Sequence, residues 1–325
     1  MKGERFIVFL LVVLLAGCQN VPEVEIHVRE CAGLPAGGRA AARACTLSGK
    51  GYVFAGRDEK GRYTNDLWQY DPAADSWSKV TNFPGKVRVS AAFAAYDGAL
   101  YAGMGYGVGK IYADSSYLHD WWRWNPGTNT WDTLAPYPYE TTVAPTMFVV
   151  GSRIYAIYGT SDGFSRQITY YDPKNDSWHS FEDSHLRALS VFGGVGVSCE
   201  GLYYFGLGNN NANITQWYRV DLDADNWTKL KNAPGKERTF SACAASAHHV
   251  YVTGGRCFAG DLTGGEIFGD ILQYTPSSDQ WAYAGDLPCG QAENQIAFAI
   301  EGKVYFGLGE DEEGNLINQM YCIEE

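Results

Sequence analysis

The chain has 325 residues, of which 46% are hydrophobic and 14% aromatic, with 38 Gly and 12 Pro. This is enough apolar material for a large core, and long periodic apolar runs are absent beyond the N-terminus, so we expect many short strands joined by turns. The formal net charge of -12 argues against a nucleic-acid partner.

The N-terminus is typical of an export signal. Lys2 and Arg5 precede the apolar run "FIVFLLVVLLAG", which has the length of a signal peptide and is short for a membrane span. The run ends in "LAGC" at Cys18, which resembles a bacterial lipobox; an ordinary signal peptide with a chance cysteine is the alternative. The resemblance implies a lipid on Cys18 and, with Gln19 following it, sorting to the outer membrane. We expect a signal peptide over 1–17, a lipidated tether over 18–23 and one domain over 24–325.

Two sequence markers recur through that domain. The first is a turn phrase that ends in tryptophan: "YDPAADSW" at 70, "WNPGTNTW" at 124, "YDPKNDSW" at 171, "VDLDADNW" at 220 and "YTPSSDQW" at 274. The second is Tyr-x-x-x-Gly, which begins at Tyr52, Tyr101, Tyr155, Tyr204, Tyr251 and Tyr305. Both recur about every 50 residues, a period that indicates a kelch-type propeller.

Each unit is interpreted as four strands. The first strand consists of small residues, as in "VSAAFAAY", and the second ends in glycine. The third resembles "DLWQY", and the fourth begins at the tryptophan. The turn before the tryptophan contains Asp or Asn, which tolerate left-handed backbone. Small residues suit the crowded centre of a propeller and large aromatics the wider space between blades, so the repeat aromatics are interpreted as core.

These features resemble kelch repeats over Val24 to the C-terminus, although only Gly254-Gly255 keeps the double glycine of that family. With "FPG" and "APG" after the tryptophan, the chain is similar to kelch-type lipoproteins of Bacteroidetes, often called galactose-oxidase-like. The resemblance implies an all-β, six-bladed kelch β-propeller. Because the chain stops before a sixth tryptophan, we expect the N-terminal "VEIHVRECAGLP" to supply the last strand and close the ring. Cys31 and Cys322 would then lie on adjacent strands, as a disulfide or as buried thiols.

Arginines recur in the loops that form the mouth of a propeller. Pro-x-x-x-Arg places Arg39, Arg88 and Arg238 before a first strand, whereas Arg57 and Arg256 directly follow a second strand. Arginines at matching places line the mouth of animal kelch domains that bind acidic peptides. The resemblance therefore implies an anion site, because guanidinium groups suit carboxylates and phosphates. The alternative is that each arginine pairs with a neighbouring Asp or Glu. Tyr106, in a long loop over residues 106–118, is a further recognition candidate.

The sequence favours binding over catalysis. Four of its six His are scattered, and His248 and His249 fall together in a predicted turn. No pair has the spacing of metal ligands, so we expect no metal, no cofactor and no copper oxidase. The architecture also resembles the bacterial N-acetylneuraminate mutarotase, which needs a catalytic glutamate and an arginine. The Glu-x5-Arg pairing of that enzyme is missing at the matching position, which leaves Glu237, Glu293 and Glu310 as candidate acids.

We therefore predict a monomeric, non-catalytic protein of the bacterial cell envelope, attached to the membrane by its lipid alone. Its mouth would bind a glycan, an acidic ligand or an envelope protein. An acidic-sugar mutarotase or epimerase is the alternative.

Overall fold

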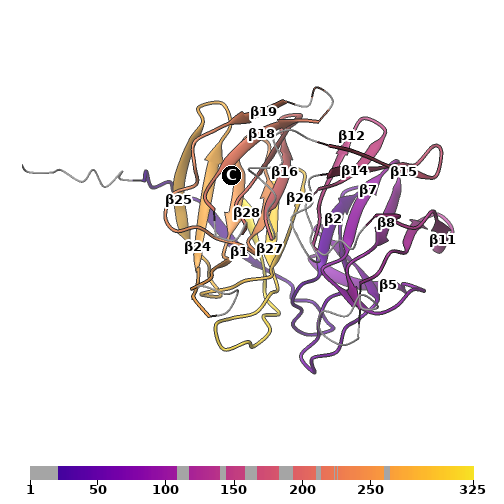
Figure 1. Ribbon diagram of the computed structural model, residues 1–325. Helices are drawn as coiled ribbons and strands as arrows, with labels where there is room; N and C mark the ends of the chain where they lie inside the picture. The colour runs from indigo at the N-terminus through magenta and orange to yellow at the C-terminus, as the bar shows by residue number, and fades with distance from the viewer. Residues whose placement is uncertain are drawn as a thin grey trace, which may run out of the picture.

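The computed structural model describes residues 21–107, 117–139, 144–157, 167–182, 193–209, 214–222, 224, 226–259 and 264–325. These residues form six four-stranded antiparallel sheets, each a blade, and the chain visits the blades in order (Figure 1). None of the described segments is a helix of the length and apolarity that a membrane crossing needs.

Within each blade the strands are given from the innermost, beside the axis, to the outermost. Blade one is β2 (Arg43–Leu47), β3 (Lys50–Phe54), β4 (Asp66–Asp71) and β5 (Ser76–Asn82); blade two is β7 (Ala92–Tyr96), β8 (Ala99–Gly103), β10 (Trp121–Asn125) and β11 (Thr130–Leu134). Blade three is β12 (Thr146–Val150), β13 (Arg153–Ile157), β14 (Gln167–Asp172) and β15 (Ser177–Glu182); blade four is β16 (Val195–Cys199), β17 (Leu202–Gly206), β18 (Trp217–Asp221) and β19 (Asn226–Lys229). Blade five is β20 (Ala242–Ala245), β21 (Val250–Thr253), β24 (Asp270–Thr275) and β25 (Gln280–Asp286). Two ribbons, β6 (Arg88–Val89) with β9 (Tyr106–Gly107) and β22 (Arg256–Cys257) with β23 (Glu266–Ile267), lie in loops.

Blade six combines segments from opposite ends of the chain: β26 (Ile296–Ile300), β27 (Lys303–Gly307), β28 (Met320–Glu324) and, outermost, β1 (His27–Cys31). β1 pairs antiparallel with β28, from His27 opposite Glu324 to Cys31 opposite Met320, and the two labels lie close together in Figure 1. Because Arg29 faces Cys322, Cys31 and Cys322 are two residues out of register, and both thiols are free.

The turn phrase joins neighbouring blades, as blade three illustrates. The Asp176 carboxylate accepts hydrogen bonds from the Tyr171 hydroxyl (2.6 Å) and the Ala135 N–H (2.8 Å). Nε1 of Trp178 donates to the carbonyl of the same Ala135 (3.0 Å), just after the outer strand of blade two. The same contacts recur in blade one with Tyr70, Asp75 and Trp77 around Ala32, and in blade five with Tyr274, Asp279 and Trp281 around Lys231. The three aspartates have φ between 45° and 49°, which confirms the left-handed turn positions.

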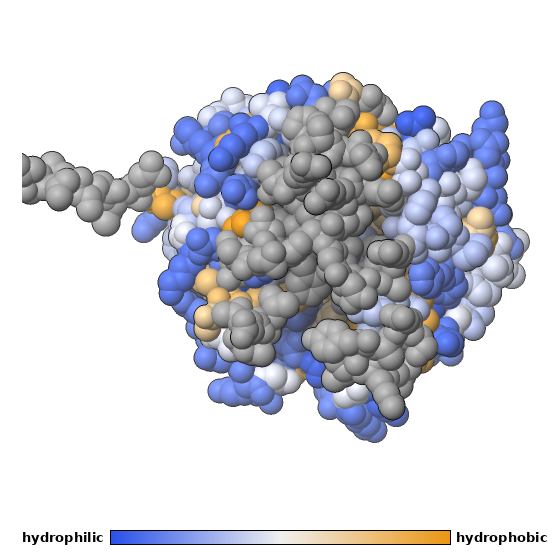
Figure 2. Space-filling model, viewed as in Figure 1, coloured by the Kyte–Doolittle hydropathy of each residue, from blue (hydrophilic) through white to orange (hydrophobic). Residues whose placement is uncertain are grey.

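The core fills the spaces between blades. Between blades two and three, Trp121 is fully buried against Tyr171 and Trp178, with ring centroids 5.9 and 5.4 Å away. Trp217 makes the same kind of contact between blades four and five. The interpretation of the repeat aromatics as core is therefore confirmed. The visible described surface is mostly hydrophilic (Figure 2), and Leu202 is the one large hydrophobic side chain exposed among the described residues.

Candidate functional site

Two sets of loops emerge at the same end of the propeller. One set joins the outer strand of a blade to the inner strand of the next, as residues 83–91 do, and the other joins second to third strands, as residues 55–65 do. We call this end the loop face. It carries the five arginines and Tyr106 that the sequence singled out.

Hydrogen-bonded backbone segments lie around the axis at the loop face. One residue just before each inner strand takes part, and we call these six the collar: Ala41, Ser90, Ala144, Gly193, Phe240 and Asn294. Hydrogen bonds of 2.8 to 3.3 Å run from Ala144 N–H to Ser90, from Ser90 to Ala41, from Ala41 to Asn294, from Asn294 to Phe240 and from Phe240 to Gly193. All six have φ between 51° and 63°, a region that non-glycine residues seldom adopt. The collar thus links the six blades and forms the floor of the mouth.

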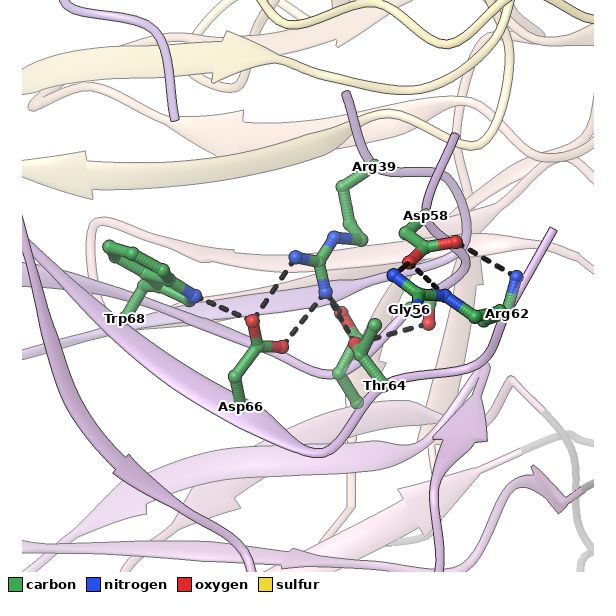
Figure 3. A network of polar contacts seen from close by, with 8 residues as sticks. Arg39, Gly56, Asp58, Arg62, Thr64, Asp66 and Trp68 are labelled. Atoms are coloured by element: carbon green, nitrogen blue, oxygen red, sulfur yellow. Dashed lines mark hydrogen bonds and ion pairs between the residues drawn. The ribbon is translucent and has the colours of Figure 1, made fainter. Parts of the chain in front are cut away.

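Three of the predicted arginines are enclosed in ion pairs. Arg39, Arg88 and Arg238 are at most 2% exposed, and each donates two hydrogen bonds to an aspartate at the third strand of its own blade. The distances are 2.8 and 3.1 Å to Asp66 (Figure 3), 2.8 and 2.7 Å to Asp120, and 2.6 and 2.9 Å to Asp270. These pairs hold loop to blade, so the site proposed below does not include the three arginines.

The electrostatics of the Arg39 pair show why it forms. Burial raises the pKa of Asp66, but hydrogen bonds and charge from Arg39 outweigh this, and the pKa lies below its usual range. Trp68 also donates to this carboxylate at 2.7 Å, and both contacts are drawn in Figure 3. The ionised pair is therefore the favoured state at neutral pH.

Arg57 and Arg256 belong to a more open group. Arg57 pairs with Glu310, which also accepts a hydrogen bond from the Asn294 side chain at 3.1 Å. Arg256 donates to both oxygens of Glu293 at 2.9 and 2.6 Å. Glu293 and Glu310 are joined by two backbone hydrogen bonds of 3.0 Å, which bring the two ion pairs together. We call these five residues the mouth cluster.

The mouth cluster is partly open to solvent and bordered by aromatics. The side chains of Arg57, Arg256 and Glu310 are 32, 19 and 17% exposed, whereas Glu293 is 8% exposed. Phe258 lies 5.8 Å from the Arg256 guanidinium. The remaining border contains half-buried Tyr63, Tyr106, Tyr117 and Phe240.

The sequence analysis named Glu293 and Glu310 only as candidate acids, and it missed Tyr63 and Asn294. Tyr63 lies near Tyr106: burial and the Tyr106 hydroxyl raise the pKa of Tyr63, and Arg57 lowers it. Glu310 directly follows a second strand and its glycine, the position of Arg57 and Arg256 in their blades, so aligning that position in all blades could have grouped Glu310 with the two arginines. Asn294 has no comparable signal.

Other predicted residues lie elsewhere. Glu237 is exposed and makes no contact with the mouth cluster among the described residues. Cys18 and the signal segment lie outside the described residues. In the part of the chain that the structure describes, no three His, Cys, Asp or Glu side chains are grouped to hold a metal ion.

Comparison with known proteins identifies the family. Residues 17–192 match the model of the KLHDC2/KLHL20/DRC7 Kelch-repeats domain. The chain belongs to this kelch-repeat family. Mouse Kelch-like protein 35 is 24% identical over 277 residues, which are 84% of this chain and 44% of that protein. N-acetylneuraminate epimerase 2 of Escherichia coli O6:H1 is 32% identical over 117 residues, 34% of this chain and 30% of that protein. The kelch chain thus spans less than half the length of these curated relatives.

A solved structure supports the fold. The chain described as "Structure of YjhT" superposes with a TM-score of 0.75 at 16% identity, covering 91% of this chain and 99% of that one. The predicted all-β, six-bladed kelch β-propeller is confirmed.

Proposed function

We propose that this kelch propeller binds a ligand with a carboxylate group, an acidic glycan or an acidic peptide, at the mouth cluster. Arg57 and Arg256 are the proposed anion contacts. The observation that carries the proposal is the meeting of two partly exposed guanidinium groups above the collar, beside half-buried aromatics. Kelch propellers commonly bind proteins or ligands, and this chain has the kelch fold.

The contacts of Arg57 leave room for such a ligand. Among the described residues, only one of its nitrogens contacts a side-chain acceptor, Glu310, although a guanidinium carries five N–H donors. A ligand carboxylate that displaced Glu310 from Arg57 would leave that glutamate hydrogen-bonded to Asn294. The aromatic border adds apolar contact area for a sugar ring or peptide side chain.

The charge balance defines the kind of recognition. Two Arg and two Glu make the mouth cluster formally neutral, and the whole chain carries -12. Long-range attraction therefore contributes little to binding an anion, and short hydrogen bonds must supply the affinity. We expect only a weak dependence of the affinity on salt, since salt screens distant charges most.

A thermal-shift screen tests the proposal. The probes are N-acetylneuraminate, neutral sugars, and a Glu-rich peptide with its Gln counterpart. A ligand at 100 times its dissociation constant stabilises the protein by about 2.7 kcal/mol. We expect a shift with acidic probes only, lost in Arg57→Ala/Arg256→Ala and kept in the control Arg123→Ala, whose arginine is exposed on β10. Equal shifts with neutral probes, or a shift that survives in the double variant, would contradict the proposal.

An acidic-sugar epimerase is the second candidate. It is favoured by Glu310, which lies at the mouth between an arginine and an amide, as a general acid or base beside an anion contact would. The partial similarity to N-acetylneuraminate epimerases points the same way. The test is anomer exchange of N-acetylneuraminate followed by ¹H NMR. Exchange above the buffer rate that is lost in Glu310→Gln would support an enzyme, and exchange at the buffer rate would contradict it.

We further propose that the protein is anchored at the cell envelope through a lipid on Cys18. The support is the lipobox-like "LAGC" after an apolar run. Metabolic labelling with palmitate should mark the wild type and not Cys18→Ser. Labelling of both, or of neither, would contradict the anchor.

A further inference from the structure

The inner strands of the propeller surround a cavity of about 160 Å³ on the axis. It lies directly behind the collar, because its wall consists mainly of the first residues of all six inner strands. Most of the described wall is small or apolar, and its polar side chains are Arg43, Thr146, Ser241, Cys243 and Gln295. None of the described lining residues carries a carboxylate.

Arg43 brings a charge into this cavity with few protein partners. Its Nε–H donates to the carbonyl of Ala91 at 3.2 Å, and no described residue provides an acceptor for the two terminal nitrogens. The polar neighbours are engaged elsewhere: Ser241 donates to Gly254 at 2.9 Å, and Gln295 accepts from Thr253 at 3.2 Å. Burial lowers the pKa of Arg43 to about 10, so the guanidinium stays protonated at neutral pH.

Arg43 is partly exposed, and it differs in its partners from the three fully buried arginines. Arg39, Arg88 and Arg238 each have an aspartate with two hydrogen bonds. Burying a charge without a counter-charge is unfavourable, and at these three arginines the aspartate supplies the counter-charge. Arg43, which is partly exposed, has no such aspartate among the described residues, and its side chain lines the cavity instead.

We propose that the axial cavity binds a small monovalent anion, chloride or a short carboxylate such as acetate, on the terminal nitrogens of Arg43. The inner strands are sheet edges, so backbone N–H groups facing the axis can add further donors. Space is sufficient, since a cavity holds a water from roughly 10–15 Å³. This site is independent of the mouth cluster and of the proposed ligand.

The test is the thermal unfolding midpoint of the purified protein at constant sodium, as gluconate is replaced by chloride or by acetate. We expect a saturable rise of the midpoint in the wild type with the smaller anions. Arg43→Met should abolish the rise, and the matched control Arg123→Met, at an exposed arginine, should keep it. A flat wild-type response, or the same rise in Arg43→Met, would overturn the proposal.

A second measurement uses the wild type alone, in case Arg43→Met does not fold. Crystals grown in bromide should show an anomalous peak beside Arg43 on the axis. Water without an anomalous peak at that position would overturn the proposal.

Discussion

Replacing Arg88 by Met tests whether the buried arginines hold their loops to the blades. The Arg88 side chain is 0% exposed and gives Asp120 two hydrogen bonds of 2.8 and 2.7 Å. It also donates to the carbonyls of Met104 at 2.9 Å and Lys86 at 3.0 Å. Removing one partner of a buried pair costs roughly 3–5 kcal/mol. Because Asp120 is 30% exposed and regains some hydration, we expect about 3 kcal/mol, the lower end of that range.

Urea unfolding measures this free energy. Arg123→Met is the matched control, because Arg123 and Asp132 are 44 and 48% exposed and such pairs contribute about 0.2–1 kcal/mol. Adding Asp120→Asn to Arg88→Met should recover part of the loss, since the uncompensated carboxylate disappears. A loss below about 1 kcal/mol for Arg88→Met, within the range of an exposed pair, would refute the assignment of Arg88 to blade stability.

Three further predictions concern stability. The lowered pKa of Asp66 means that its contribution is present above the unfolded-state pKa of about 3.9 and is lost as pH falls below it. Urea midpoints between pH 6 and pH 3 should therefore fall less in Asp66→Asn than in the wild type. Asp176→Ala, which loses two turn contacts, should lower the free energy of unfolding by about 1–3 kcal/mol. Asp132→Ala, at an exposed residue, should hardly change this free energy. Equal losses in the two variants would contradict the role of Asp176 in joining blades. Gly103→Ala should lower the free energy of unfolding by about 1–3 kcal/mol, because a Cβ there would lie 2.1 Å from a backbone oxygen. The control Gly127→Ala should have the same urea midpoint as the wild type.

The repeat made most of the fold predictable. Two markers recur about every 50 residues, and the six copies of Tyr-x-x-x-Gly give the number of blades. The turn aspartates adopt the left-handed backbone expected of them. The joining function of the turn phrase was not predictable, because Asp176 contacts the backbone N–H of Ala135, 41 positions earlier, and a backbone group leaves no mark in the sequence.

The site was harder to predict, because its contacts cross the ring closure. Arg57 and Glu310 are 253 residues apart in the chain and meet because blades one and six are neighbours. The buried pairs left a fainter signal in the sequence. Three blades carry Pro-x-x-x-Arg before their inner strand, and in each of them an aspartate begins or directly precedes the third strand. Comparing blades for co-occurrence of the two residues could have found these pairs.

Calorimetric titration of matched acidic and neutral ligands tests the central claim most directly. The pairs are N-acetylneuraminate with its methyl ester, and the Glu-rich peptide with its Gln counterpart. We predict that the wild type binds one of the acids, does not bind its neutral partner, and loses the affinity in Arg57→Ala/Arg256→Ala. Equal binding of acid and neutral partner, or unchanged binding by the double variant, would contradict recognition of a carboxylate at the mouth cluster.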